Sequence, residues 1–247
     1  MRARDDAAAI VRLGAVGSTN DEAMARLRSA GAPVWVVAER QTGGRGRRGR
    51  PWVSEPGNLY ASFAFPVVMP ADAFAFLPLA AAVALRDAIA AATGLAPALK
   101  WPNDALIGGR KVAGILVESE AGGSTGARRA VIGFGVNVAH APGDVAAARL
   151  LDHRPDATAG ALFEALRPAL AAVLARLGAP GGVPALAARW REAAIGIGAP
   201  VTVRFDAAVR EGIFMDLDDS GRLMLQESDG TVTPVTAGDV FLRAETP

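Results

Sequence analysis

The chain of 247 residues contains no cysteine. This absence excludes disulfides, thiolate nucleophiles and metal centres held by cysteine. The chain also has no apolar stretch long enough to cross a bilayer, because the longest one, residues 73–85, is interrupted by Pro78. Residues 1–6 include two acidic residues and no apolar core, which argues against a signal peptide. We therefore expect a cytoplasmic protein with no membrane partner.

Lysine is almost absent as well, since Lys100 and Lys111 stand beside 24 arginines. A chain that uses arginine nearly everywhere is expected to keep lysine where a compact ammonium group serves better than a guanidinium. Both lysines lie in one polar stretch, which makes them candidates for a specific task. The formal net charge is only +1, so the surface as a whole is not expected to attract nucleic acid.

Hydrophobic periodicity predicts an α+β domain followed by a small all-β domain, which we divide into residues 1–195 and 196–247. In the first domain we expect a helix starting near residue 18, with Thr19 and Glu22 as a capping box. Further helices are expected at 72–92, 160–177 and 184–194, and strands at 34–38, 58–65, 111–118 and 129–138. The second domain is predicted to contain short strands at 201–205, 212–217, 222–225 and 231–235.

A loop rich in glycine and arginine occupies residues 39–50. Its Gly44-x-Gly46-x-x-Gly49 pattern matches a dinucleotide fingerprint, but the helix that such a fingerprint requires does not follow it. Glycines permit close approach and movement of the backbone, and arginines offer paired donors to phosphate oxygens. We interpret the tract as a loop that closes over a phosphate. A nucleic-acid-binding tract is the alternative, although the interleaved aromatic residues of single-strand binders are missing.

Two further patterns carry less weight. Gly122-Gly-Ser124-Thr-Gly126 matches the nucleophile elbow of serine hydrolases, but it joins two expected strands rather than a strand and a helix. His140 and His153 have no carboxylate partner at metal-ligand spacing, so we interpret them as loop residues. Neither a serine hydrolase nor a histidine metal site is expected.

Five motifs follow one another along the chain, and together they resemble the biotin protein ligases. These motifs are Ser18-Thr-Asn20, Gln41–Gly49, Lys100-Trp-Pro-Asn-Asp104, Gly109–Glu118 and Gly133-Phe-Gly-Val-Asn137. They occur in the family's order, and the resemblance covers most of the chain. It implies a mixed-sheet catalytic domain of the biotin/lipoate ligase type with a small C-terminal SH3-like β-barrel.

The resemblance also implies a reaction in two steps. The biotin carboxylate attacks the α-phosphate of ATP, with Mg²⁺ present, to give biotinyl-5′-AMP and pyrophosphate. The ε-amine of a lysine on a biotin carboxyl carrier protein, such as the carrier domain of acetyl-CoA carboxylase, then takes the biotinyl group and releases AMP. Catalysis of this kind depends mainly on positioning two anions and spreading the charge on phosphorus.

Residue roles follow from the same resemblance. Lys111 and Arg47 are the implied catalytic residues: Lys111 contacts the biotin carboxylate and the α-phosphate, and Arg47 retains the adenylate beneath the closed loop. The residues implied in biotin binding are Ser18, Thr19, Asn20, Gln41, Arg45, Gly46, Arg47, Lys111 and Gly114. Those implied in binding ATP or the adenylate are Arg45, Arg47, Arg48, Trp52, Asn103, Asp104, Lys111 and Asn137, with Asp104 as a candidate magnesium ligand.

A lipoate or octanoate ligase is the main alternative, because these enzymes share the fold. The related octanoyl transferases use a cysteine nucleophile, which this chain lacks. A nucleic-acid binder is a third reading, and it predicts steeply salt-dependent binding. We expect no nucleic-acid partner and leave a homodimer open. Because the first motif begins at residue 18, we expect the ligase-only type, without the N-terminal winged-helix domain and repressor activity of larger members.

Overall fold

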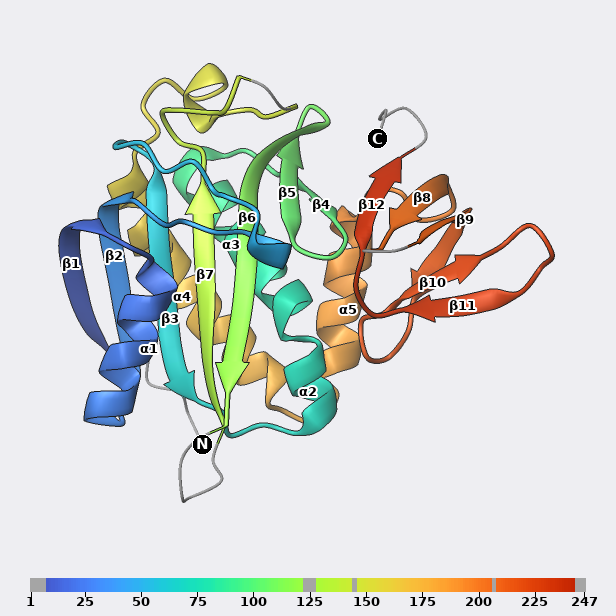
Figure 1. Cartoon of the computed structure of the whole chain (residues 1–247), viewed down its shortest axis with the longest axis horizontal. Coiled ribbons are helices and arrows are strands. Elements are labelled where there is room, and N and C mark those ends of the chain that lie inside the picture. Colours follow the sequence, from blue (N-terminus) through green and yellow to red (C-terminus); the bar gives the residue numbers. More distant parts are fainter. Residues whose placement is uncertain (1–7, 122–127, 144–145, 206–207, 243–247) are drawn as a thin grey trace.

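The computed structural model describes residues 8–121, 128–143, 146–205 and 208–242, so the Gly122–Gly126 pattern lies outside the described residues. A seven-stranded sheet with the order β1-β2-β3-β7-β6-β5-β4 organises the larger, N-terminal part (Figure 1). Only the β1–β2 pair is parallel. Its strands are β1 (Ala9–Val16), β2 (Val34–Gln41), β3 (Leu59–Pro66), β4 (Ala98–Lys100), β5 (Asp104–Ile107), β6 (Arg110–Glu120) and β7 (Arg129–Val136).

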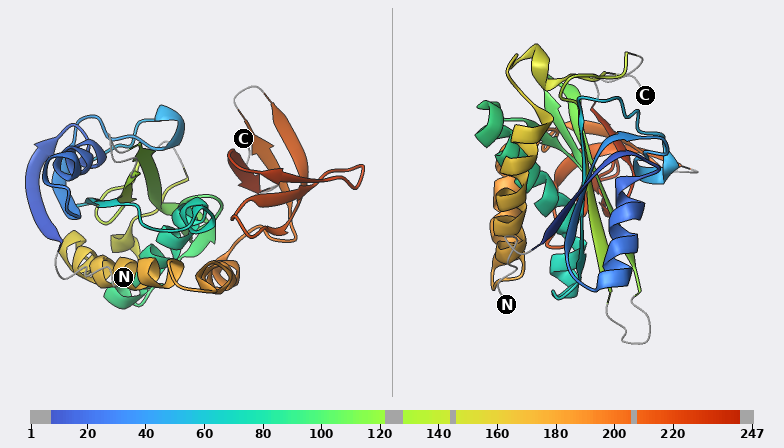
Figure 2. Two further views of the ribbon diagram at one scale, coloured as in Figure 1. Left: turned by 90° about the horizontal axis from the view of Figure 1, so that it is seen from below. Right: turned by 90° about the vertical axis from the view of Figure 1, so that its left-hand side faces the viewer.

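Helices cover both faces of this sheet. One face carries a single helix, α1, and the other carries α3 and α4, which pack against each other, with α5 beside them (Figure 2). The helices are α1 (Thr19–Ala30), α2 (Ala71–Ala75), α3 (Leu77–Thr93), α4 (Ala159–Leu177) and α5 (Gly182–Ala193). No helix within the described ranges is both long and apolar enough to cross a membrane.

The C-terminal part is a five-stranded antiparallel sheet with the order β11-β10-β9-β8-β12. Its strands are β8 (Pro200–Arg204), β9 (Val209–Leu217), β10 (Leu223–Gln226), β11 (Val232–Val235) and β12 (Asp239–Leu242). This sheet stands beside β4, β5 and α5 (Figure 1). The expected change from an α+β domain to a small all-β unit is confirmed.

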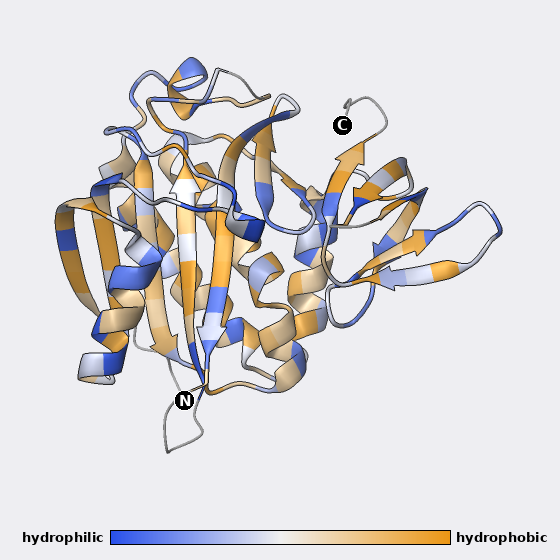
Figure 3. Cartoon of the chain, viewed as in Figure 1, coloured by the Kyte–Doolittle hydropathy of each residue, from blue (hydrophilic) through white to orange (hydrophobic). Residues whose placement is uncertain are grey.

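The main core lies between the large sheet and helices α3 and α4, where apolar residues dominate the ribbon (Figure 3). Trp35 on β2 is fully buried at its centre, with its ring centroid 4.9 Å from Phe63 and 5.4 Å from Phe163. Offset and edge-on arrangements at such distances are those that aromatic rings prefer. The core therefore gives a rigid support to the opposite face of the sheet, on which α1 packs through a smaller apolar cluster.

Three expectations about the elements require correction. The helix expected at 72–92 is divided into α2 and α3 at Phe76, because Pro78 lacks an N–H and is tolerated only in the first turn of a new helix. Strands β1 and β12 were not foreseen. The capping box is wrong as well: Ser18 is the N-cap of α1, and the hydroxyl of Thr19 donates to Gln41 Oε1 instead.

Tyr60 on β3 is the only tyrosine of the chain, and it is 1% exposed. Its hydroxyl donates to Glu55 O at 2.8 Å, and burial raises the pKa of the phenol to about 12. Stability from the buried neutral phenol is therefore complete below pH 10 and is lost as the pH rises towards 12. We expect ultraviolet titration of the native protein to show one phenol with a midpoint near 12; a native midpoint near the unperturbed value would contradict this.

Candidate active site

A cavity of about 780 Å³ lies between the large sheet, the loop of residues 42–58 and strand β12. It opens on the face of the sheet opposite α3 and α4, beside the start of α1. All of the site residues predicted from the sequence line this cavity except Arg48. They are Ser18, Thr19, Asn20, Gln41, Arg45, Gly46, Arg47, Trp52, Asn103, Asp104, Lys111, Gly114 and Asn137. Five sequence motifs separated by up to about a hundred residues thus meet at one place.

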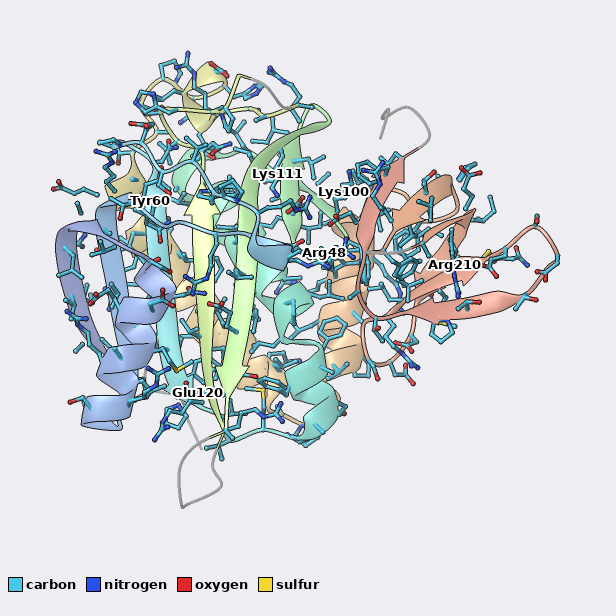
Figure 4. The ribbon with its side chains drawn as sticks, viewed as in Figure 1. Arg48, Tyr60, Lys100, Lys111, Glu120 and Arg210 are labelled. Carbon is cyan, nitrogen blue, oxygen red and sulfur yellow. The ribbon has the colours of Figure 1, made fainter. Side chains whose placement is uncertain are left out.

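Lys111 stands near the start of β6, where the β5–β6 hairpin places it opposite Leu106 on β5 (Figure 4). The hairpin turns at Gly108 and Gly109, whose φ angles of 58° and 76° suit a primed turn. Lys111 Nζ lies 2.7 Å from Asp104 Oδ1 and 5.3 Å from the ring centroid of Trp52. The ammonium group is therefore held at the cavity wall by one carboxylate and one aromatic ring.

The backbone of Lys111 is fixed by a second segment of the chain. Its N–H donates to Ala146 O, and its carbonyl accepts from Ala148 N, each at 2.9 Å. Asn137, only 3% exposed, donates from Nδ2 to Ala148 O at 3.2 Å and to Lys111 O at 3.5 Å. The side chain of Asn137 thus ties the lysine strand to residues 146–148, in addition to lining the cavity.

A chain of polar side chains forms the wall of the cavity near α1. Gln41 Oε1 accepts from the N–H and the hydroxyl of Thr19, at 2.8 and 3.0 Å, and Gln41 Nε2 donates to Ser54 Oγ at 3.2 Å. Ser62, fully buried on β3, lies 2.8 Å from Thr19 Oγ1 and 2.7 Å from Asn20 Oδ1. We call Thr19, Asn20, Gln41, Ser54 and Ser62 the polar wall. Buried polar groups that are linked in this way hold fixed orientations, as recognition of a compact polar ring requires.

Glycines form the floor of the cavity. A Cβ atom at Gly133 would lie 2.3 Å from Asn20 Oδ1, and one at Gly135 would lie 2.6 Å from Trp52 Cε2. A Cβ atom at Gly114 would lie 3.1 Å from Cζ3 of the same indole ring. The absence of side chains here lets Trp52 and Asn20 lie directly on the sheet. Only Gly114 was predicted as a site residue; the Gly133–Asn137 motif was the signal for the other two.

The arginine loop is joined to the C-terminal sheet through Asp239 on β12. Arg50 Nη2 lies 2.5 Å from Asp239 Oδ1, and Arg48 Nη1 lies 3.3 Å from Oδ2. Arg47, 20% exposed, donates to Gly238 O at 3.1 Å and lies 3.9 Å from Asp239; burial lowers the pKa of its guanidinium. Asp239 is thus the carboxylate that ties the arginine loop, beside the cavity, to β12.

Arg48 does not line the cavity. It has a positive φ of 58°, which is unusual for a residue with a side chain, and its guanidinium is directed to Asp239 and to Arg204 O (Figure 4). Asp239 is the principal functional residue that sequence analysis missed. It lies at the start of a short strand, and nothing in the neighbouring sequence indicates that it pairs with arginines about 190 positions away.

No group of three or more histidine, aspartate or glutamate side chains that could hold a metal ion occurs among the described residues. Asp104 is a carboxylate at the cavity wall, and one of its oxygens is paired with Lys111. Mg²⁺ is commonly held by one or two carboxylates together with substrate phosphates and water. The residues present therefore fit a magnesium ion that enters with the phosphates of a nucleotide.

Comparison with known proteins identifies the class to which this fold belongs. The Biotin/lipoate A/B protein ligase family matches residues 15–137, and the Biotin protein ligase C terminal domain matches residues 196–243. The fold is thus that of the biotin/lipoate ligase class. Two curated relatives are named biotin–[acetyl-CoA-carboxylase] ligase. The one from Paracoccus denitrificans is 38% identical over 91% of this chain and 96% of its own length, and the one from Mycobacterium tuberculosis is 39% identical over 91% and 85%.

The solved structure of the biotin protein ligase from Aquifex aeolicus in complex with biotin and ATP has the same fold. It superposes with a TM-score of 0.77 at 24% identity, covering 95% of this chain and 98% of that one. With relatives this similar over nearly their whole length, the chain belongs to the biotin protein ligase family.

Proposed function

We propose that this protein activates biotin with ATP as biotinyl-5′-AMP, and transfers the biotinyl group to a lysine of a biotin carboxyl carrier protein. The names of the curated relatives support the overall activity, and the Aquifex complex supports biotin and ATP as its ligands. We further propose a cytoplasmic location, a catalytic domain at residues 1–195 and a C-terminal domain at 196–247.

The observation that carries the proposal is the position of Lys111. Lys111 lines the same cavity as Thr19 and Gln41 of the polar wall and as Arg47 of the arginine loop, with its ammonium group 2.7 Å from Asp104 Oδ1. There it is suited to hold the biotin carboxylate beside the α-phosphate and to stabilise the charge that develops when the carboxylate oxygen attacks phosphorus. The bond from that oxygen to the α-phosphorus forms as the bond to pyrophosphate breaks, so the main contribution of the protein is alignment and charge stabilisation.

The polar wall is proposed to receive the ureido ring of biotin. That ring offers two N–H donors and one carbonyl, and Thr19 and Gln41 supply a hydroxyl and an amide group in fixed orientations. Ser18, next to this wall, and Asn20, within it, also line the cavity and are assigned to biotin. Gly114 leaves room for the ligand above the sheet next to the Lys111 side chain.

On the nucleotide side we assign Arg47, Asn103, Asp104 and Asn137, with Trp52 as a packing surface. Arg47 Nη1 also lies 3.4 Å from Asn103 Oδ1, which connects the loop to the 100–104 motif. A magnesium ion, when bound, supplies further neutralisation of the phosphates. Arg48 does not line the cavity, and its guanidinium is directed to Asp239. We assign it to this group only in a state in which it leaves Asp239 and contacts a phosphate.

The test is biotin-dependent exchange of labelled pyrophosphate into ATP, with no carrier present. Exchange that requires biotin establishes the first half-reaction, and transfer to an added biotin carboxyl carrier protein then tests the second. Exchange with lipoate or octanoate but not with biotin would identify the alternative ligase. No exchange with any of these acids would contradict adenylation itself.

Replacing Gly135 by alanine should weaken ligand binding without unfolding the protein. The new methyl group would meet the Trp52 ring at 2.6–2.9 Å, so the indole must leave its place on the sheet. Overpacking of this kind costs about 1–3 kcal/mol, and we expect the KM for biotin in pyrophosphate exchange to rise about tenfold. Gly14→Ala on β1 is the matched control, because its Cβ would meet nothing within 4 Å. Equal kinetics for the two variants would contradict the role given to the glycine floor.

A further inference from the structure

Arg45 behaves differently from the other arginines of its loop. Its guanidinium makes a paired contact with Asp21 on α1, at 2.8 and 2.5 Å, and lies 3.5 Å from Glu118 on β6. By contrast, Arg47, Arg48 and Arg50 are all directed to the C-terminal sheet. The two ends of the arginine loop are therefore anchored to different parts of the molecule.

The two ends of the arginine loop also differ in the charged groups that surround them. At the Arg45 end, two carboxylates surround one guanidinium, whereas at the other end, within the described residues, Arg47 and Arg50 are both directed to the single carboxylate of Asp239. A paired contact with a carboxylate is among the strongest that arginine makes. The hydrogen bond from Arg45 lowers the pKa of Asp21, so that this carboxylate is charged at neutral pH. Arg45 is thus neutralised by the protein itself, so its guanidinium is not available to a phosphate.

The Arg45 end is also connected to the polar wall. Glu118 Oε2 accepts from Asn20 Nδ2 at 2.7 Å, and Asn20 Oδ1 lies 2.7 Å from Ser62 Oγ. Arg45 separates the main cavity from a small hollow of about 140 Å³ that Asp21 and Glu118 line. Gly44, the preceding residue, lies so close to Gln41 and Ser54 that a Cβ there would be 3.0 Å or less from each. A shift of Arg45 would therefore move the backbone next to the polar wall.

We propose that Asp21 and Glu118 form a carboxylate clamp on Arg45, and that the clamp is a specificity-determining device of the biotin pocket. In this view Arg45 is a positioning residue: its guanidinium holds the first part of the loop against the polar wall and does not contact phosphate. The inference rests on the proposed function. It replaces the adenylate contact that the family resemblance implies for this side chain.

The clamp is tested by a double-mutant cycle with Asp21→Asn, Arg45→Gln and the double variant. We expect each single variant to raise the KM for biotin and the rate of biotinyl-adenylate release about tenfold, with the KM for ATP changed less than twofold. The double variant should resemble either single one, because residues that act through one contact do not add. A rise in the KM for ATP in Arg45→Gln alone would overturn the proposal, since it would show a phosphate contact.

Glu22→Gln is the matched control. Glu22 is also acidic and also lies in the first turn of α1, but it pairs with Arg26 rather than with the loop. We expect its kinetics to equal those of the wild type, with similar thermal unfolding in all variants, because Asp21 is 61% exposed. Wild-type exchange together with an unchanged biotin KM in Asp21→Asn would reject the clamp alone. Absence of biotin-dependent exchange in the wild type would reject the proposed function.

Discussion

Replacing Lys111 by alanine is expected to lower the rate of biotin-dependent pyrophosphate exchange by a factor of about 100 to 1,000, the loss typical of removing a positioned donor from a developing charge. The ammonium group is the only cation that the structure places directly against Asp104 at the cavity wall, among the described residues. The proposed contact of Lys111 with the α-phosphate strengthens as charge develops on phosphorus. Its removal should therefore lower kcat more than it raises the KM for biotin or for ATP. An unchanged exchange rate would contradict the assignment.

Two further variants distinguish a catalytic role of Lys111 from the effect of leaving the Asp104 carboxylate unpaired. Lys111→Ala leaves the carboxylate of Asp104 without its ion-pair partner, which is itself unfavourable. The double variant with Asp104→Asn removes that carboxylate charge and should remain as slow as Lys111→Ala. Lys111→Arg should recover little, because a planar guanidinium cannot replace a point charge where two anions converge. Recovery by either variant would indicate that Lys111 has a structural rather than a catalytic role.

Replacing Arg47 by glycine is expected to release biotinyl-adenylate before transfer. Arg47 joins the loop to Gly238 O and to Asn103 Oδ1, at 3.1 and 3.4 Å. Hydrogen bonds from charged groups contribute about 1.5–3 kcal/mol each, so we expect the intermediate to leave about 10 to 100 times faster. Its appearance in solution can be followed by mass spectrometry, and added bystander protein should become biotinylated. Tighter retention of the intermediate would refute the loop closure.

Arg48→Gly provides the control for this prediction. The residue belongs to the same turn and also contacts Asp239, but it does not line the cavity. Its positive φ of 58° is readily adopted by glycine, so the backbone should not be disturbed. We expect at most a small increase in adenylate release. An effect as large as that of Arg47→Gly would mean that retention depends on loop charge in general rather than on Arg47.

Most of the site was predictable because its residues lie in short motifs with local meaning. The Gly108-Gly109 turn joins β5 and β6 in a register that pairs Lys111 with Leu106, and from there the lysine side chain reaches Asp104, two residues away along β5. The glycine-arginine loop was recognisable from composition alone. In these places the chemistry is encoded within a few neighbouring residues.

The missed features depend on contacts between distant segments. Strand β1 is mostly exposed and exists through its parallel pairing with β2, and β12 consists of four residues paired with β8. The pairs of Arg45 with Asp21 and of Arg50 with Asp239 likewise join surface charges that no local pattern relates. The capping box failed for the same reason, because a distant glutamine competes for the Thr19 hydroxyl.

The near absence of lysine determines how this protein would behave as a labelling reagent. A free acyl-adenylate reacts with primary amines, whereas guanidinium groups stay protonated and do not compete. Among its side chains only Lys100 and Lys111 carry such an amine. A leaking variant would therefore modify its surroundings far more than its own side chains, and peptide mapping of side-chain self-modification would concern two positions, Lys100 and Lys111.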